Sequence, residues 1–314
     1  MKKKLVAGAV TLLSVVTLAA CANGTNKDIV TMKGDTITVS DFYNEIKTNQ
    51  GAQQVLFQMT INKVFEKEYG SKISDKEVDK ELAKQKKQLG NQFDAYLAQQ
   101  GLTEETAKKQ IRSNMLLEYA VNQAAKKDIK ESDYKAAFES YTPEVTAQII
   151  KLDSEDKAKE VLEAAKAEGA DFAQIAKDNS TDTATKDKGG EVKFDSGTAD
   201  IPSQVKEAAF KLDENSISDV ITVSAGQNYS ASYYIVKLNK KTEKGSDWKK
   251  YEKRLKEIIV DGRKQDTNYI RSIIAKAMTN ANIKVKDDAF KSTFNQYLQN
   301  IGVETSGSSS SSKK

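Results

Sequence analysis

The sequence predicts an α+β fold in which a small unit of antiparallel sheet and helices is inserted into a mainly helical domain. Two observations support this prediction. Apolar residues recur at helical spacing through residues 40–135 and again through residues 248–279, and neither stretch contains proline. Between them, short β-branched runs alternate with short helical runs. Because each helical stretch needs a surface to cover its apolar face, we expect the two stretches to pack together.

The length and charge of the chain narrow the class of protein. Its 314 residues are enough for two domains that each bury a core. Charged residues make up 30% of the chain and are spread along it, which does not fit a transmembrane enzyme. The net charge of +4 includes Lys2, Lys3 and Lys4, and subtracting these three from 49 basic residues leaves 46 against 45 acidic ones. Such a balance argues against nucleic acid as a partner.

Missing residue types exclude several catalytic mechanisms. The chain has no histidine and one cysteine. It therefore has no imidazole general base, no Ser-His triad, and no zinc site built from histidines or several cysteines. We accordingly predict no metal centre and no cofactor. A single cysteine also allows no intramolecular disulfide.

The N-terminus has the features of a signal peptide, predicted over residues 1–20. Three lysines precede an apolar stretch, residues 5–17, which is shorter than the roughly 20 residues that span a bilayer. The sequence Leu-Ala-Ala-Cys then ends at Cys21 and resembles the bacterial lipobox. That resemblance implies S-diacylglycerol and N-palmitoyl groups on Cys21, with residues 21–28 as a lipidated tether. The alternative is an ordinary secretory leader in which Cys21 is incidental.

The N-terminal helical segment is predicted over residues 29–142. It opens with a hairpin over residues 29–39, where apolar and polar residues alternate around a glycine. Ser74 and Glu77 have the spacing of a capping box, so a helix should begin there. A similar, weaker start is expected at Thr103. Two glycines are expected to mark helix ends: Gly90 and Gly101.

The inserted unit is predicted over residues 143–241, beginning at Pro143. Its first strand is expected at residues 145–152, and Gly189 with Gly190 should form a tight turn before the second strand. The full predicted order is strand, helix 154–168, helix 171–178, Gly-rich loop 179–190, strand, helix 203–210, strand, and a closing strand within 231–240.

The C-terminal helical segment is predicted over residues 242–304, followed by a Ser-rich tail, residues 305–314, that should be disordered. Aromatic residues of the N-terminal segment are predicted to pack in the core, although some could instead line a chaperone groove. These aromatic residues are Phe42, Phe57, Phe65, Phe93 and Tyr96.

Four blocks of the inserted unit resemble the parvulin-type peptidyl-prolyl isomerases. They are residues 146–150 (TAQII), 169–176 (GADFAQIA) running into 179–182 (NSTD), 189–192 (GGEV) and 207–212 (EAAFKL). Each block is weak, but their order over about 95 residues is specific. Together with the lipobox leader and the helical flanks, the architecture resembles the PrsA-type foldase lipoproteins of Gram-positive bacteria, in particular the streptococcal ones.

This resemblance implies a foldase, attached through a lipid anchor to the extracellular face of the cell membrane. Its partners would be unfolded, newly translocated secreted proteins, and a homodimer through the helical domain is compatible with the family. The implied enzyme class is peptidyl-prolyl cis-trans isomerase (EC 5.2.1.8). Uncatalysed X-Pro isomerisation takes about 10 to 100 s, long enough for exposed apolar segments to aggregate.

The resemblance also implies site residues, with a departure from the usual family pattern. Active parvulins carry a histidine on the first strand and another on the last, and here those positions are Gln148 and Tyr234. The carboxylate that often follows the Ser-Thr stretch is Asp182. The proline pocket maps onto Ile201 and Val205, together with Phe210 and Phe194.

Two interpretations of this site stay open. An apolar pocket could desolvate the prolyl bond while Asp182, Gln148 and Tyr234 orient the peptide, giving an isomerase without histidine. Alternatively the domain has lost catalysis, the protein is a non-catalytic holdase, and Asp182 is a loop or cap carboxylate. A third function, a solute-binding or adhesin lipoprotein, is disfavoured because the chain lacks the strand-helix alternation of two α/β lobes.

Overall fold

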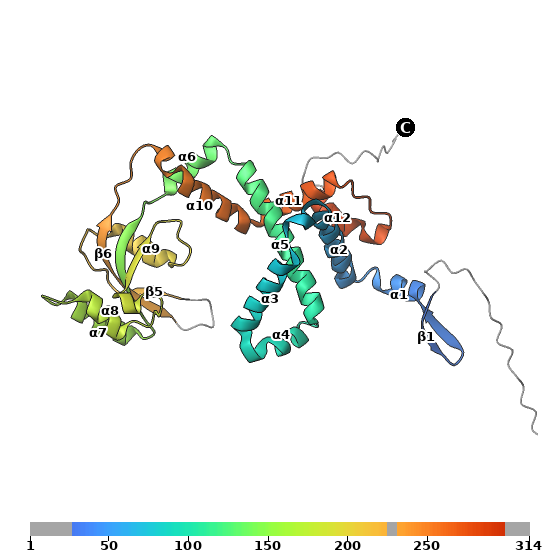
Figure 1. The fold of residues 1–314 in the computed structure, drawn as a ribbon, viewed down its shortest axis with the longest axis horizontal. Coiled ribbons are helices and arrows are strands. Elements are labelled where there is room, and N and C mark those ends of the chain that lie inside the picture. The colour runs from blue at the N-terminus through green and yellow to red at the C-terminus, as the bar shows by residue number, and fades with distance from the viewer. Residues whose placement is uncertain (1–26, 225–230, 299–314) are drawn as a thin grey trace, which may run out of the picture. The chain divides into compact units, whose positions relative to one another are not determined.

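The computed structural model describes residues 27–224 and 231–298, and the predicted leader, Cys21 and the Ser-rich tail lie outside them. The chain forms two compact units (Figure 1). The first comprises Met1–Leu116 with Ile274–Lys314, and the second comprises Leu117–Ile273. The predicted boundaries at 142/143 and 241/242 both fall inside the second unit. Among the described residues, no helix combines the length and hydrophobicity of a membrane span.

The first unit begins with the predicted hairpin. Strands β1 (Asp28–Met32) and β2 (Asp35–Thr38) pair antiparallel, and Gly34 occupies the turn with a φ of +88°. The helices of this unit are α1 (Val39–Ile46), α2 (Gln50–Tyr69), α3 (Asp75–Leu89), α4 (Phe93–Gln99), the first half of α5 (Glu104–Lys127), the end of α11 (Thr267–Asn280) and α12 (Lys291–Leu298).

Side-chain caps fix where these helices begin. Glu77 accepts a hydrogen bond from the Ser74 backbone at 2.7 Å, and the Ser74 hydroxyl accepts one from the Glu77 backbone at 3.3 Å, which confirms the predicted capping box. Helix α5 begins after Thr103 as predicted, although the reciprocal partner of Thr103 is the hydroxyl of Thr106. The predicted helix ends are confirmed at Gly90, the C-cap of α3, and at Gly101, which follows α4.

The prediction that five aromatic residues of this segment are core residues was partly wrong. Phe65 and Phe93 are buried, and Phe57 is half-buried against Tyr297 of α12, with ring centroids 4.3 Å apart. By contrast, Phe42 is 53% exposed and Tyr96 is 43% exposed. Helical spacing identifies the apolar face of a helix, but it does not show whether another element covers that face.

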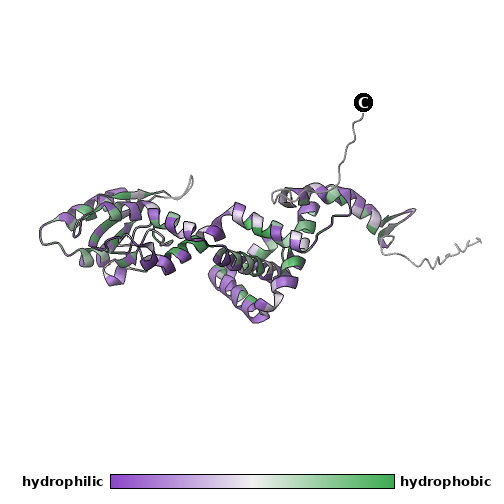
Figure 2. Cartoon of the chain, turned by 90° about the horizontal axis from the view of Figure 1, so that it is seen from above, coloured by the Kyte–Doolittle hydropathy of each residue, from purple (hydrophilic) through white to green (hydrophobic). Residues whose placement is uncertain are grey.

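The second unit contains a four-stranded antiparallel sheet in the order β4-β3-β6-β5. Its strands are β3 (Val145–Leu152), β4 (Glu191–Phe194), β5 (Ile221–Val223) and β6 (Ser232–Lys241). Helices α7 (Glu155–Lys166) and α8 (Phe172–Asn179) cover one face, and α9 (Ser203–Lys211) covers the other. This arrangement matches the predicted order of elements and confirms the α+β class. Figure 2 shows that the helices carry both hydrophilic and hydrophobic residues.

Residues of β3 and β6 alternate between the two faces of the sheet. Ala147 and Ile149 pack with Val205 of α9, whereas Ile150 and Leu152 pack in a second cluster with α7 and α8. This two-residue period is the general property of a strand buried on both faces. This alternation determines which side chains of β3 and β6 lie on the face of the sheet that α9 covers.

The flanking helices of the second unit pack on each other through aromatic rings. Helix α6 (Glu131–Ser140) contacts α10 (Glu252–Gln265) and the short turn that precedes it. The Tyr134 and Trp248 rings stack at 5.0 Å, and those of Phe138 and Tyr251 at 5.7 Å. Such stacking adds about 0.5 to 1.5 kcal/mol per pair beyond the area buried.

Substitution of Gly190 tests how tightly the turn before β4 packs on β3. Its φ is +78°, and a Cβ there would lie 2.5 Å from the Ile149 carbonyl oxygen; Gly169, at φ +77°, has open space around it. Gly169→Ala should therefore destabilise the unit by about 1 to 2 kcal/mol through left-handed strain alone. Gly190→Ala should destabilise it by about 3 kcal/mol or more, because backbone must also move. Urea unfolding followed by Trp248 fluorescence measures both, and equal losses would contradict the packing.

Candidate functional site

The four predicted proline-pocket residues lie together on the α9 face of the sheet. Phe194 and Val205 are completely buried, and the rings of Phe194 and Phe210 lie 5.8 Å apart. Ile201 and Phe210 pack against the same cluster but stay half-exposed. The buried pair forms the floor of the cluster, so Ile201 and Phe210 are the members that a bound peptide can touch without rearrangement.

Tyr234 reaches the same cluster from β6. Its ring packs against the buried residues of the α9 face, and it remains half-buried. Burial raises the pKa of the Tyr234 phenol, and the charges of Asp182 and Asp153 raise it further. The hydroxyl therefore stays protonated at neutral pH and can both donate and accept a hydrogen bond.

Asp182 lies in the loop after α8, and its carboxylate is used within that loop. It accepts hydrogen bonds from the Thr185 hydroxyl at 2.6 Å and from the Ala184 backbone at 3.1 Å. The neighbouring Thr181 backbone donates to the Lys151 carbonyl of β3 at 2.8 Å. These contacts fit the loop role predicted for Asp182, and its other predicted role, orienting a peptide, stays a prediction.

Gln148 does not share a face with Tyr234. It lies between Ala147 and Ile149, both directed to the α9 cluster, so strand alternation directs Gln148 to the opposite face. There it is buried, and its side-chain amide donates to the Gly189 carbonyl at 3.0 Å. Of the three residues predicted to orient a peptide, the structure thus brings Tyr234 to the apolar cluster and uses Gln148 to hold the turn before β4.

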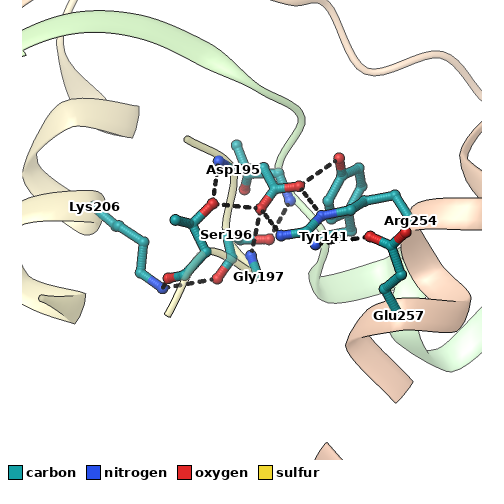
Figure 3. Close-up of polar contacts among 9 residues, drawn as sticks. Tyr141, Asp195, Ser196, Gly197, Lys206, Arg254 and Glu257 are labelled. Atoms are coloured by element: carbon teal, nitrogen blue, oxygen red, sulfur yellow. Dashed lines mark hydrogen bonds and ion pairs between the residues drawn. The ribbon is translucent and has the colours of Figure 1, made fainter. Parts of the chain in front are cut away.

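A polar cluster that sequence reasoning missed begins at the residue that follows Phe194 (Figure 3). Asp195, the residue after Phe194, is only 6% exposed. Its carboxylate accepts hydrogen bonds from Arg254 Nε at 2.6 Å and Nη2 at 2.8 Å, and from Tyr141 Oη at 3.0 Å. The Thr198 hydroxyl and the Gly197 backbone also donate to it. The Asp-Ser-Gly-Thr sequence signals a local turn, but Arg254 lies 59 residues further on and no local pattern connects the two.

Burial and charge act in opposite directions on Asp195. Burial raises the pKa of its carboxyl, but the hydrogen bonds from Arg254 and Thr198 and the Arg254 charge together hold that pKa below its usual range. Burial is also the main reason why the pKa of Tyr141 is raised. At neutral pH the cluster is therefore an ion pair with a protonated phenol beside it.

A separate apolar groove of about 770 Å³ lies in the first unit, between α1, α2 and the segment before α12. Val55 and Met59 line it although they are 60% and 52% exposed. Two lysines, Lys284 and Lys286, also line it, and the Tyr43 hydroxyl donates to Asp287 there at 2.7 Å. Exposed apolar residues gathered in a hollow are typical of a binding surface.

Comparisons with known proteins show which family the chain belongs to. A family described as "Rotamase: PPIC-type PPIASE domain" matches residues 120–240. The foldase protein PrsA of Streptococcus sanguinis is 61% identical over 302 residues, covering 96% of this chain and 90% of that protein. The chain belongs to the PrsA foldase family. PrsA of Streptococcus gordonii is 60% identical over the full length of both chains.

Solved PrsA structures are similar to this one. The crystal structure of PrsA from Streptococcus pneumoniae has a TM-score of 0.78 at 54% identity, and it covers 86% of this chain and 99% of its own. That of PrsA from Lactococcus lactis has a TM-score of 0.65 at 38% identity, with 87% and 99% covered. The predicted resemblance to PrsA foldases and to parvulin-type isomerases is confirmed.

Proposed function

We propose that this protein is a membrane-anchored foldase on the extracellular face of the cell, where it assists the folding of newly translocated secreted proteins. The observation that carries the proposal is the open apolar groove of the first unit, in a chain of the PrsA foldase family. Residues 29–142 and 242–304 supply the helical chaperone segments, and residues 143–241 the isomerase-type domain.

The occupant we assign to the groove is an apolar segment of an unfolded protein. Met59 is unbranched and polarisable, so it adapts to side chains of different shape. Val55 and Leu56 add apolar contact, and Lys284 and Lys286 can meet acidic residues of the client. A surface of this kind holds many different sequences weakly, as a chaperone must.

Substitution in the groove tests this assignment. The double variant Val55→Ser and Met59→Ser removes apolar contact from two largely exposed positions, so the free energy of unfolding should change by less than about 0.5 kcal/mol each. Its ability to suppress aggregation of an unfolded client should fall severalfold, measured by light scattering. Tyr96→Ser, which removes a 43% exposed side chain outside the groove lining, is the control.

Other outcomes of this experiment discriminate between occupants. If the double variant suppresses aggregation as well as wild type, the groove does not hold clients. If its sedimentation shows a changed oligomeric state while client holding is intact, the groove is an interface between two copies of the chain.

A second candidate function, prolyl isomerisation, is favoured by the half-exposed Ile201 and Phe210 beside Tyr234. An X-Pro bond must twist out of plane to isomerise, against a barrier of roughly 20 kcal/mol. The twisted amide loses its resonance and is less polar than the planar one, so an apolar surface that excludes water favours it. Tyr234 packs against the same cluster, and its hydroxyl can hold the peptide by a hydrogen bond. Asp182 supports the loop.

Isomerisation of a short Xaa-Pro peptide by the full chain tests this second function. We expect a rate above the uncatalysed one, measured by exchange NMR. Ile201→Ala should lower kcat/KM about tenfold, because it removes contact worth roughly one to two buried methylenes. Leu162→Ala, the same kind of truncation against the cluster on the opposite face, is the control. A wild-type rate equal to the uncatalysed rate would leave the domain as a binding module.

We further propose that Cys21 carries the lipid anchor. The proposal is supported by the lipobox-like sequence ending at this single cysteine. A Cys21→Ser variant should lack the acyl groups and keep its leader, whereas wild type should be membrane-bound with the mass of an acylated mature chain. Immunoblotting of cell fractions and intact-mass measurement check both. An unmodified cysteine in the mature wild-type protein would contradict the proposal.

A further inference from the structure

The loop of residues 195–201 connects two members of the apolar cluster beside Tyr234. Phe194, at the end of β4, is buried in the floor of that cluster, and Ile201, at the other end of the loop, offers its half-exposed side chain. Pro202 then N-caps α9, which carries Val205. The position of Ile201 therefore depends on how this loop is held.

The loop is held from outside the isomerase-type domain by α10. Arg254 makes a two-pronged contact with Asp195, and its Nη1 donates to Glu257 at 3.1 Å on its own helix. The loop also packs tightly on this helix, because a Cβ at Gly197 would overlap the Ile258 side chain. A guanidinium fork fixes both the distance and the orientation of a carboxylate, which a lysine cannot do.

The same loop is also held by Lys206 of its own domain and by Thr142, the residue just before that domain (Figure 3). Lys206 of α9 donates to the carbonyls of Ser196 at 3.0 Å and Thr198 at 2.6 Å. The Ser196 backbone donates to the Thr142 carbonyl at 3.1 Å, and the Thr142 backbone donates to the Ser196 hydroxyl at 2.9 Å. To these contacts the C-terminal segment adds the packing of Ile258 and the charged hydrogen bonds of Arg254.

We propose that Arg254 is a positioning residue of the prolyl-binding site. Through Asp195 it holds the loop of residues 195–201 in the conformation that presents Ile201 to a bound proline. The inference rests on the prolyl site proposed above. It also extends that site, because residues 143–241 alone lack both Arg254 and Tyr141, two of the partners of the Asp195 carboxylate.

The physical reason is the burial of Asp195. Its carboxylate is almost inaccessible to water, and leaving a buried charge without its partner is strongly unfavourable. Without Arg254, the chain lowers the unfavourable free energy of this unpaired charge by moving Asp195 toward solvent. The loop that begins at Asp195 must then move with it. Displacement of a binding group by about 1 Å can reduce activity a hundredfold.

The test uses the full chain and an Xaa-Pro peptide whose binding is titrated by NMR. Arg254→Ala should weaken peptide binding about ten- to a hundredfold and accelerate amide hydrogen exchange at residues 196–198. Arg254→Lys, which keeps the charge but not the fork, should give an intermediate result. Arg271→Ala removes an exposed arginine of the same unit and should leave both measurements unchanged.

Rescue separates positioning from a general loss of stability. Added guanidinium at millimolar, non-denaturing concentration should enter the site vacated in Arg254→Ala and restore both peptide binding and amide protection. Loss of binding in that variant with rescue by guanidinium supports the proposal. Faster exchange with unchanged peptide binding, or lost binding that guanidinium does not restore, overturns it. A wild-type chain that binds no prolyl peptide overturns the prolyl site itself, and Arg254's role in it, while leaving the client groove untouched.

Discussion

The second unit depends on one constraint, the burial of β3 on both faces. Val145, Ala147 and Ile149 support α9, and Ile150 and Leu152 support α7 and α8, so one strand fixes both helix layers. Because the side-chain period of a strand is two, each residue of β3 belongs to one layer or the other. The chemistry of the domain is divided in the same way. Tyr234 faces the apolar cluster, and Gln148 faces the turn at Gly189.

Local rules explain how much of the fold could be predicted. Ser74 and Glu77 form the expected capping box, and the strand at residues 145–152 follows the expected break at Pro143. Such signals are contained within a few residues, and the structure satisfies them where they occur. The prediction that Phe42 and Tyr96 are core residues was wrong for a different reason. Whether an apolar face is covered depends on distant parts of the chain, which periodicity does not describe.

The candidate site shows even more clearly that sequence patterns do not report contacts between distant parts of the chain. The resemblance brought Ile201, Val205, Phe194 and Phe210 together, because they lie between or within blocks that keep the family order. It also paired Gln148 with Tyr234, although the β3 residues on either side of Gln148, Ala147 and Ile149, are the ones that face the α9 cluster. Asp195 and Arg254 were missed because a buried ion pair between residues far apart in sequence leaves no local pattern. Only the fold makes them neighbours.

The buried pair also bears on how a domain of this family can work without histidine. A hydrogen-bonded network of imidazoles would orient the peptide directly, whereas this chain offers an apolar cluster, one phenol and a loop fixed by a guanidinium. An apolar surface has no directional contacts of its own, so its usefulness depends on being held still. Asp195, Arg254 and Lys206 together hold the loop that carries Ile201. In the prolyl site proposed here, positioning comes from the elements around the apolar cluster, and α10 is one of them.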